Sequence, residues 1–316
     1  MTAGREVIMR HALMGVVLAA AAATAYAQTY SRGQNVSPAF EGWEQNADGT
    51  FNFLFGYMNR NWEEELTVPV GPDNALEPGG PDRGQPTRFL PRRNRFVFRV
   101  PQDWGDKELV WTLTTNGRTE RAYASLRQDY FIDDVVIASE TGALGAGSSN
   151  PEVRANKPPL VRIEGARTRT ARVGEPLALA ALVTDDGIPK PRTPARTSAP
   201  VPAAPTNTAA PAPRNPLYTP PSRLTVNKRT GLHLAWFVYR GEGRARFEPA
   251  QIKVWEDTRT GANSPWAPLW TAPPVPADGR YTATVTFDAP GTYVLRARAD
   301  GGALFGDDEL TIVVTP

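Results

Sequence analysis

Three short runs near the end of the chain decide the fold: YTATVTF at Tyr281–Phe287, TYVLRARA at Thr292–Ala299 and ELTIVVT at Glu309–Thr315. In each run, one set of alternate residues is mainly apolar and the other mainly polar. Pro290-Gly291 and a Gly/Asp loop separate the runs. This alternation between turns is typical of antiparallel strands with one buried and one solvent-facing side. The stretch therefore predicts an all-β fold, and it indicates no particular chemistry.

The first 27 residues have the pattern of a signal peptide. A basic start is followed by an apolar run at Ala12–Ala25, and Ala25-Tyr26-Ala27 fits the small-x-small rule for cleavage before Gln28. The apolar run is shorter than the roughly 20 residues needed to span a membrane. We therefore expect an exported protein, periplasmic or extracellular, with no transmembrane segment after cleavage and a flexible lead-in at residues 28–37.

Composition excludes several kinds of site. The sequence has no cysteine, so disulfides, thiolate metal sites and a cysteine nucleophile are ruled out. Its formal net charge is +2 at pH 7, and removal of Arg5, Glu6 and Arg10 with the signal peptide leaves +1. Such a small net charge does not indicate a nucleic-acid partner. The chain of 316 residues is long enough for two domains.

The region from residue 38 to residue 140 predicts a first β-domain. Five runs suggest strands: Thr50–Met58, Glu65–Val70, Arg95–Val100, Glu108–Thr115 and Thr119–Ser125. Asn116-Gly117 is a preferred two-residue hairpin turn, and the Gly/Pro-rich segment Asp73–Pro86 predicts a loop. Gln128–Ser139 suggests either a short helix or a last strand. We expect a β-sandwich, with a small barrel as the alternative.

A Gly/Ser/Ala-rich linker at residues 141–155 leads to a second predicted domain at residues 156–316. Seven runs suggest its strands: 160–164, 177–184, 232–239, 251–256, 281–287, 293–299 and 309–315. Residues 188–222 interrupt them with a Pro/Ala-rich insert. Because proline lacks the N–H that a strand ladder needs, we expect this insert to be disordered. The expected architecture is two antiparallel β-sandwiches in tandem.

Motifs in the second domain resemble those of bacterial Ig-like and PKD-like extracellular modules. Asp288–Leu295 resembles their D-x-x-G-x-Y-x-L stretch, and Val173–Leu177 is similar to the lead into their second strand. The resemblance implies a sandwich of about seven strands. It also implies that the Tyr293 hydroxyl bonds backbone across a turn and that Trp236 packs in the core. No family resemblance is identified for the first region.

The run Leu232–Tyr239 is apolar on both faces, which predicts a central, well-buried strand. It contains His233, the one histidine left after signal cleavage. A packed role is expected for this histidine, because no Gly-x-Ser-x-Gly motif accompanies it to support a catalytic triad.

Two groups in the first region are candidate ligand-binding residues. Tryptophans near turns could stack on sugars, and clustered arginines could grip an anionic polysaccharide through paired donors. These candidates are Trp43, Trp62, Trp104, Arg92, Arg93 and Arg95. The alternatives are core packing for the tryptophans and ion pairs for the arginines, with Glu63–Glu65, Asp103 or Asp106 as partners.

Clustered carboxylates allow two further kinds of site. Paired carboxylates can carry out glycoside hydrolysis, and the clusters are Glu63–Glu65, Asp133-Asp134, Asp185-Asp186 and Asp307–Glu309. Loop oxygens at one end of a sandwich could also bind Ca²⁺. The candidate calcium ligands are Asp185, Asp186, Asp300, Asp307 and Asp308. Solvated turn and edge positions are the simpler explanation, and no other cofactor is indicated.

From Gly187 to Gly241 the chain has eight basic residues and no acidic one. A mobile basic arm would make salt-sensitive contacts with anionic polymers or a protein partner. We expect an exported, non-enzymatic binding or structural module of the bacterial cell envelope, with an envelope polymer, polysaccharide or protein as partner. The alternatives are a carbohydrate-binding protein, a weakly recognisable carbohydrate-active enzyme, or a small enzyme that uses carboxylates.

Overall fold

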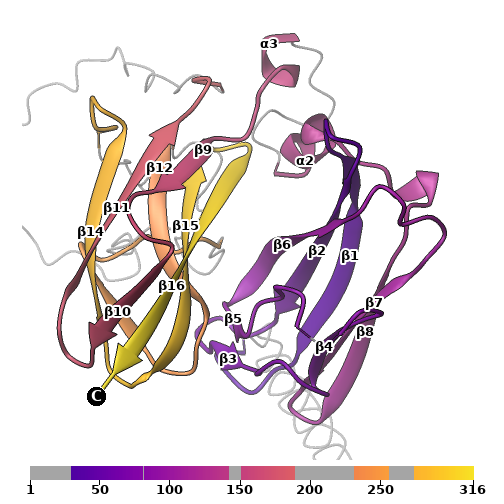
Figure 1. Ribbon diagram of the computed structural model, residues 1–316. Helices are drawn as coiled ribbons and strands as arrows, with labels where there is room; N and C mark the ends of the chain where they lie inside the picture. Colours follow the sequence, from indigo (N-terminus) through magenta and orange to yellow (C-terminus); the bar gives the residue numbers. More distant parts are fainter. Residues whose placement is uncertain (1–29, 81, 142–150, 189–230, 256–273) are drawn as a thin grey trace, which may run out of the picture.

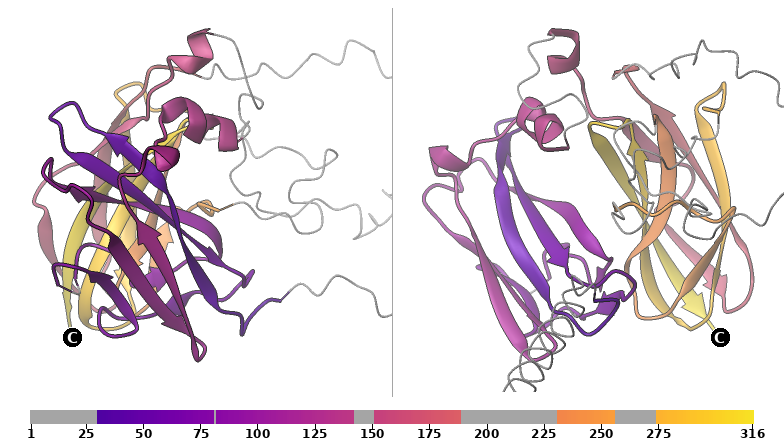
Figure 2. Two further views of the ribbon diagram at one scale, coloured as in Figure 1. Left: turned by 90° about the vertical axis from the view of Figure 1, so that its right-hand side faces the viewer. Right: turned by 180° about the vertical axis from the view of Figure 1, so that it is seen from behind.

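The computed structural model describes five segments of the chain, residues 30–80, 82–141, 151–188, 231–255 and 274–316 (Figure 1). Within these segments the chain is built mainly of β-strands, in two bodies that lie side by side (Figure 2). The predicted all-β class, with two β-sandwiches in tandem, is confirmed. The predicted signal peptide and nearly all of the predicted insert lie outside the described residues.

The first sandwich consists of β1 (Val36–Gln45), β2 (Phe51–Asn59), β3 (Leu66–Thr67), β4 (Asn74–Glu77), β5 (Arg88–Phe89), β6 (Arg92–Val100), β7 (Leu109–Thr115) and β8 (Arg118–Ala124). One sheet has the order β1-β2-β6, another has the order β4-β7-β8, and β3 pairs with β5. All of these pairs are antiparallel. A short 3₁₀ turn, η1 (Gln128–Tyr130), and a helix, α2 (Asp134–Thr141), follow β8.

Aromatic side chains fill the space between the two larger sheets. Phe55 of β2 stacks on Phe96 of β6 with ring centroids 5.6 Å apart, and these two residues are register partners. Trp111 of β7 meets Phe96 edge-on at 4.9 Å and is fully buried. Because alternate residues of a strand share one face, the phenylalanine alternation in β2 and β6 builds one side of this core.

Two predictions for the first sandwich are wrong in detail. Strand β1 begins at Val36, whose N–H donates to Thr115 Oγ1 at 2.9 Å, so the fold starts inside the predicted lead-in. The predicted loop Asp73–Pro86 contains β4, which pairs with β7. Gly and Pro flank this four-residue strand closely, and they concealed its alternation.

The second sandwich consists of β9 (Leu160–Ile163), β10 (Thr168–Arg172), β11 (Leu177–Thr184), β12 (His233–Arg240), β13 (Ala245–Glu248), β14 (Arg280–Phe287), β15 (Gly291–Asp300) and β16 (Phe305–Thr315). A short helix, α3 (Pro151–Arg154), precedes it. One sheet has the order β13-β14-β11-β9, and the other has the order β10-β16-β15-β12.

This strand order is immunoglobulin-like. With β10 set aside, the strands taken in chain order as A to G form an A-B-E-D sheet and a C-F-G sheet. That is the constant-type immunoglobulin arrangement. Strand β10 is an additional edge strand that pairs with β16 in parallel. The Ig-like fold implied by the sequence resemblance is therefore present in the second sandwich.

Tyr293 and Trp236 occupy the places that the resemblance implied. Tyr293 on β15 is 1% exposed, and its hydroxyl donates to the carbonyl of Ala289 at 2.8 Å. In immunoglobulin folds, this tyrosine corner lies near the start of the same strand. Trp236 on β12 is 2% exposed and belongs to the core between the two sheets. Both structural predictions are confirmed by these contacts.

The strand predicted at 251–256 is absent from its described part, residues 251–255. The strand in this part of the chain is instead β13, which pairs with β14. Strand β10 was also not predicted, because its sequence TRTAR has little apolar alternation. Short edge strands bury few side chains, so their periodic signal is weak.

Strand β12 differs from the predicted central strand because it lies at the edge of its sheet, with β15 as its neighbour. One of its faces packs in the core of the second sandwich through Trp236 and Val238. The other face packs against the first sandwich through Phe237 and Tyr239. Both faces are apolar because two different bodies cover them.

Candidate functional site

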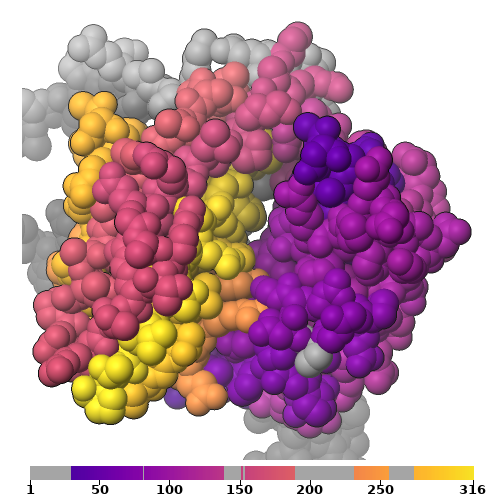
Figure 3. Space-filling view, in the orientation of Figure 1, coloured from indigo at the N-terminus to yellow at the C-terminus, as the bar shows by residue number. Residues whose placement is uncertain are grey.

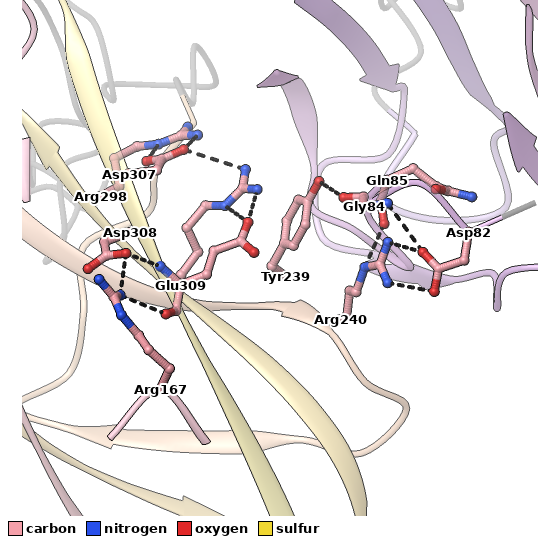
Figure 4. A network of polar contacts seen from close by, with 11 residues as sticks. Asp82, Gly84, Gln85, Arg167, Tyr239, Arg240, Arg298, Asp307, Asp308 and Glu309 are labelled. Atoms are coloured by element: carbon pink, nitrogen blue, oxygen red, sulfur yellow. Dashed lines mark hydrogen bonds and ion pairs between the residues drawn. The ribbon is translucent and has the colours of Figure 1, made fainter. Parts of the chain in front are cut away.

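The two sandwiches are joined where the end of β12 meets the loop before β5. The Tyr239 hydroxyl donates to the carbonyl of Gly84 at 2.8 Å. Arg240 donates from Nε to the carbonyl of Gln85 at 2.8 Å, and it forms an ion pair with Asp82 at 2.9 Å. Figure 4 shows both side chains directed at this loop. Hydrogen bonding by Arg240 lowers the pKa of the Asp82 carboxyl.

Tyr239 also contributes to the core of the first sandwich. Its ring is 5% exposed and belongs to the same buried cluster as Tyr57 and Phe89. Burial raises the pKa of Tyr239 to about 12. Arg296 lies on β15 of the second sandwich, and its guanidinium carbon is 3.5 Å from the centroid of the Tyr239 ring. The aromatic ring is therefore shared between the two bodies.

A buried ion-pair network supports this contact from the side of the second sandwich (Figure 4). Asp307 of β16 accepts two hydrogen bonds from Arg298, at 2.8 and 2.7 Å, and Arg296 pairs with Glu309. Burial alone would raise the pKa of Asp307. The charge and hydrogen bonds of Arg298, with the charge of Arg296, outweigh burial and hold this pKa below its ordinary value.

A second contact between the bodies lies at the opposite end of the interface. Ala138 of α2 forms a small buried cluster with Ala303 and Leu304, from the turn between β15 and β16. Lys157 Nζ lies 3.0 Å from Asp134 of the same helix. Because contacts exist at both ends, the structure joins the sandwiches along an extended boundary (Figure 3).

A groove of about 590 Å³ lies along this boundary, between β12 and β13 on one side and the segments around β3 and β5 on the other. The first sandwich lines it with Arg32, Glu63, Glu64, Glu65, Arg88 and Leu90. The second sandwich lines it mainly with aromatic, apolar and basic side chains, among them Trp236, Phe247, Gln251, Lys253 and Trp255. Ligand pockets commonly lie at domain boundaries and have volumes in this range.

Arg88 links both walls of the groove. Its Nε lies 2.6 Å from Glu65 Oε2, and its Nη1 donates to the carbonyl of Gly243 at 2.8 Å. On the opposite wall, Gln251 Oε1 accepts the backbone N–H of Trp236 at 3.0 Å. These contacts occupy Arg88 and Gln251, so both residues fix the shape of the groove.

Two tryptophans that line the groove have an indole N–H group without a partner in the described part of the chain. Nε1 of Trp236 and Nε1 of Trp255 are buried, and neither has a hydrogen-bond partner among the described residues. Buried donors in folded proteins are nearly always satisfied by protein, water or ligand. Both nitrogens are shielded from solvent, so they do not open onto the groove. The groove differs from the hollows beside Arg280 and beside Tyr123 because residues of both sandwiches line it.

The three tryptophans considered as candidates for stacking on sugars are buried, which agrees with the alternative of core packing. Trp43, Trp62 and Trp104 are 8%, 9% and 5% exposed. The Arg92 guanidinium covers Trp62 at 3.9 Å from the ring centroid, and Trp43 meets Phe131 edge-on at 5.0 Å. These rings pack against protein, which leaves no open face for a saccharide.

The predicted arginine cluster is engaged within the first sandwich. Arg93 and Arg95 both pair with Glu41 of β1, and Arg92 Nη1 donates to the carbonyl of Arg60 at 3.2 Å. The expected ion pairs therefore exist, although their acceptor is not one of the carboxylates suggested by the sequence. Ligand binding by these arginines stays a prediction.

The five candidate calcium ligands are not brought together. Asp307 and Asp308 are neighbours on β16, and they point to opposite faces and bind Arg298 and Arg167 respectively. The other three accept backbone N–H groups of their own loops, Asp185 from Gly187, Asp186 from Ile188 and Asp300 from Gly302. In the described segments, no group of three or more His, Asp or Glu side chains could hold a metal ion.

His233 is 3% exposed, and its Nδ1 lies 2.8 Å from the carbonyl of Gly231, as expected for a packed histidine. Four groove residues were recognised in the sequence for other reasons: Trp236 as a core residue, and Glu63, Glu64 and Glu65 as an acidic cluster. Trp255 was assigned only to the predicted strand 251–256 and was not considered as a site residue. The sequence signal that could have marked Trp255 as a site residue was its position close to Gln251 and Lys253.

Comparisons with known proteins identify no family. No protein-family model matches the sequence, and no curated protein matches it. Similar solved structures include the Yersinia pseudotuberculosis adhesin InvE, at 10% identity over 91% of this chain and 61% of that chain, with a TM-score of 0.23. The D0-D1 domain of Intimin aligns at 9% identity over 88% of this chain and 97% of that chain, with a TM-score of 0.21.

The chain also aligns with the N-terminal eight Ig domains of the Down Syndrome Cell Adhesion Molecule, but it covers 27% of that structure, with a TM-score of 0.22. At such low TM-scores these alignments support no argument, so the fold assignment rests on strand order. The described residues contain no helix that is long and apolar enough to cross a membrane. Strand order and the groove define a protein of two joined β-sandwiches, the second Ig-like.

Proposed function

We propose that this protein is an exported, non-enzymatic module of the bacterial cell envelope that binds its ligand in the groove between the sandwiches. The observation that carries the proposal is a groove of about 590 Å³ between the sandwiches, lined by residues of both.

The contacts of the acidic residues favour binding over catalysis. Glu65 is paired with Arg88, Asp134 with Lys157, Asp307 with Arg298 and Asp308 with Arg167. A catalytic carboxylate pair would have to face a substrate from both sides of a cleft. These pairs instead fix the structure on each side of the boundary.

Binding to isolated envelope material tests the proposed site. Trp255→Ala should weaken binding of the purified protein at least tenfold, since truncating a buried aromatic anchor costs about 2 kcal/mol or more. Tyr123→Ala is the matched control, because Tyr123 is 53% exposed and lies on another sheet face. Unchanged binding by Trp255→Ala would rule out the groove, and loss of binding by Tyr123→Ala would move the site to that other face.

Export is tested separately. Production in a bacterial host followed by cell fractionation should yield a protein that begins at Gln28, as determined by mass spectrometry. A mature protein that still carries residues 1–27 would contradict the signal-peptide prediction.

A second candidate function is that of a rigid spacer, and the contacts at both ends of the boundary favour it. A spacer requires that the two sandwiches keep one orientation in solution. Small-angle scattering should then fit a single compact arrangement, whereas a broad distribution of distances would exclude this function.

A further inference from the structure

A short segment of the first sandwich, residues 82–88, lies beside the end of β12 and the turn that follows it; we call it the docking segment. The backbone N–H of Thr87 donates to the carbonyl of Tyr239 at 3.3 Å, and Thr87 Oγ1 accepts the N–H of Gly241 at 3.2 Å. The hydrogen bonds of Tyr239 and Arg240 described above complete this joint (Figure 4). Each of these contacts is polar, and domains joined by polar contacts move relative to each other more readily than domains joined by a large apolar interface.

The face of the second sandwich that meets the first is itself suited to contact with water. Phe237, Arg296 and Glu309 are cross-strand neighbours on β12, β15 and β16, so they share this face. Arg296 pairs with Glu309, and Arg298 pairs with Asp307. Both partners of each pair belong to the second sandwich, so separation of the sandwiches leaves none of these charges unpaired. The cost of separation comes mainly from uncovering two aromatic rings of β12.

The groove has both of its walls only while the sandwiches are docked. Glu63 and Arg88 line it from the first sandwich, and Phe247 and Lys253 line it from the second. A ligand that touches both walls therefore binds the docked form better than a separated form. Its apparent dissociation constant equals the intrinsic constant divided by the fraction of molecules that are docked.

We infer that the two sandwiches separate and dock reversibly across the groove, and that ligand binding and docking favour each other. This inference rests on the proposed function of the same site. The docking segment acts from outside the groove, since Asp82 and Arg240 are not among the described residues that line it. Because such coupling is reciprocal, loosening the segment weakens ligand binding, and the ligand returns a loosened protein to the docked form. A permanently rigid pair of sandwiches would show neither effect.

Arg240→Ala loosens the docking segment without changing any described residue that lines the groove. It removes the hydrogen bond to Gln85 and the ion pair with Asp82, both charge-assisted, so the equilibrium constant for docking should fall at least tenfold. Arg127→Ala is the matched control, because the Arg127 side chain is 71% exposed and its partner, Asp129, belongs to the same sandwich. This control should leave docking unchanged.

Spin labels measure the docked fraction directly. Since the chain has no cysteine, Tyr123→Cys and Leu160→Cys place one label on each sandwich, at residues that are 53% and 72% exposed. Pulsed electron spin resonance should give one dominant distance for the otherwise wild-type protein and for Arg127→Ala. In Arg240→Ala a second distance should appear, and saturating isolated envelope material should remove it. A distance distribution for Arg240→Ala that matches the wild type would overturn the inference.

Binding to envelope material gives an independent measurement. Arg240→Ala should bind at least twofold more weakly than the wild type, and the ratio of the two dissociation constants should equal the ratio of the docked fractions. Weaker binding without a matching loss of docked protein would refute the coupling. Circular dichroism of the variants should match the wild type. If the spectrum of Arg240→Ala differs, Asp82→Asn removes the charge of the ion pair alone, and the same comparison of ratios applies.

Failure of the inference and failure of the proposed function give different results. If Trp255→Ala weakens envelope binding but envelope material leaves the distances of Arg240→Ala unchanged, the groove is the site and docking is not coupled to it. If Trp255→Ala binds envelope material as the wild type does, the groove is not the site.

Discussion

The hydroxyl of Tyr293 ties the start of β15 to the turn that precedes it. It donates to Ala289 at 2.8 Å, and its ring packs on Phe287 with centroids 4.5 Å apart. The same side chain lies against Gly241 and Gly243, in the turn between β12 and β13. One residue therefore supports two turns at this end of the second sandwich.

Removing the Tyr293 hydroxyl should measurably lower the stability of the protein. We expect Tyr293→Phe to lower the free energy of unfolding by about 1 kcal/mol, the usual contribution of such a hydrogen bond. Tyr281→Phe is the matched control, because the buried Tyr281 hydroxyl has no partner among the described residues. Its removal should be neutral or slightly stabilising. Urea unfolding compares the two variants, and equal losses would contradict the assigned role of Tyr293.

Ionisation of Asp307 should make the free energy of unfolding depend on pH. Its folded pKa lies below the ordinary value of 3.8, so its ion pair with Arg298 stabilises the fold above that value. The contribution is lost as the pH falls through the lower, folded pKa. Asp307→Asn should cost about 3 kcal/mol at pH 7, because it leaves buried arginine charge without its partner.

The comparison for Asp307 is made across pH. The difference between the wild type and Asp307→Asn should be largest near neutrality and shrink below pH 3.8, when measured by urea unfolding. A difference that stays constant down to pH 2 would show that the contribution does not come from ionisation.

The role of a residue could be predicted from the sequence where it belongs to a local motif or to an alternating run. Tyr293 follows a turn motif, and Trp236 belongs to an alternating run, so both were correctly expected to be buried. Trp62 has no such local signal, because its cover is Arg92, a residue from a different strand. Proximity to a turn does not determine the direction of a side chain, so the sequence left both sugar stacking and core packing open for Trp43, Trp62 and Trp104.

At the scale of elements, β12 shows what periodicity can and cannot report. Apolar residues on both faces correctly indicated that both faces are buried. They could not indicate that a second body covers one of them. An edge strand covered in this way has the same sequence pattern as a central strand. The short strands β4, β10 and β13 escaped prediction because each buries few apolar side chains.

The turn after β12 should tolerate little change. Gly241 has a φ of +128°, and an added Cβ would lie 2.5 Å from Cδ1 of Tyr293. Gly241→Ala should therefore destabilise by at least about 2 kcal/mol, from backbone strain and collision together. Gly174→Ala is the control, since Gly174 also has a positive φ, +79°, but no atom lies within 4 Å of its added Cβ. Thermal unfolding should show a clearly larger loss for Gly241→Ala, and equal losses would refute the steric argument.

At the scale of the whole molecule, contacts between distant parts of the sequence join the two sandwiches. Tyr239 and Gly84 are separated by 155 positions. No periodic pattern encodes such a pair, so the sequence predicted two sandwiches but neither their contact nor the groove along it. The groove was not predictable from either region taken alone, because residues of both regions line it.

Truncating Tyr239 should weaken the contact between the two sandwiches. Tyr239→Ala removes a ring that is 5% exposed, and we expect it to lower the free energy of unfolding by about 3 kcal/mol. Calorimetry should show one transition for the wild type and two for the variant, because the remaining contacts couple the sandwiches less tightly. Arg127→Ala is the control, since the Arg127 side chain is 71% exposed and pairs at 3.7 Å with Asp129 of the same sandwich. A single unshifted transition for Tyr239→Ala would show that its ring does not couple them.

The shared ring also has a consequence for the order of events during synthesis. The first sandwich leaves the ribosome before any of β12 has been made, so its core is one aromatic ring short at that stage. Tyr239 fills this place only after the long intervening segment has emerged. The nascent first sandwich therefore completes its packing later than an independent domain would.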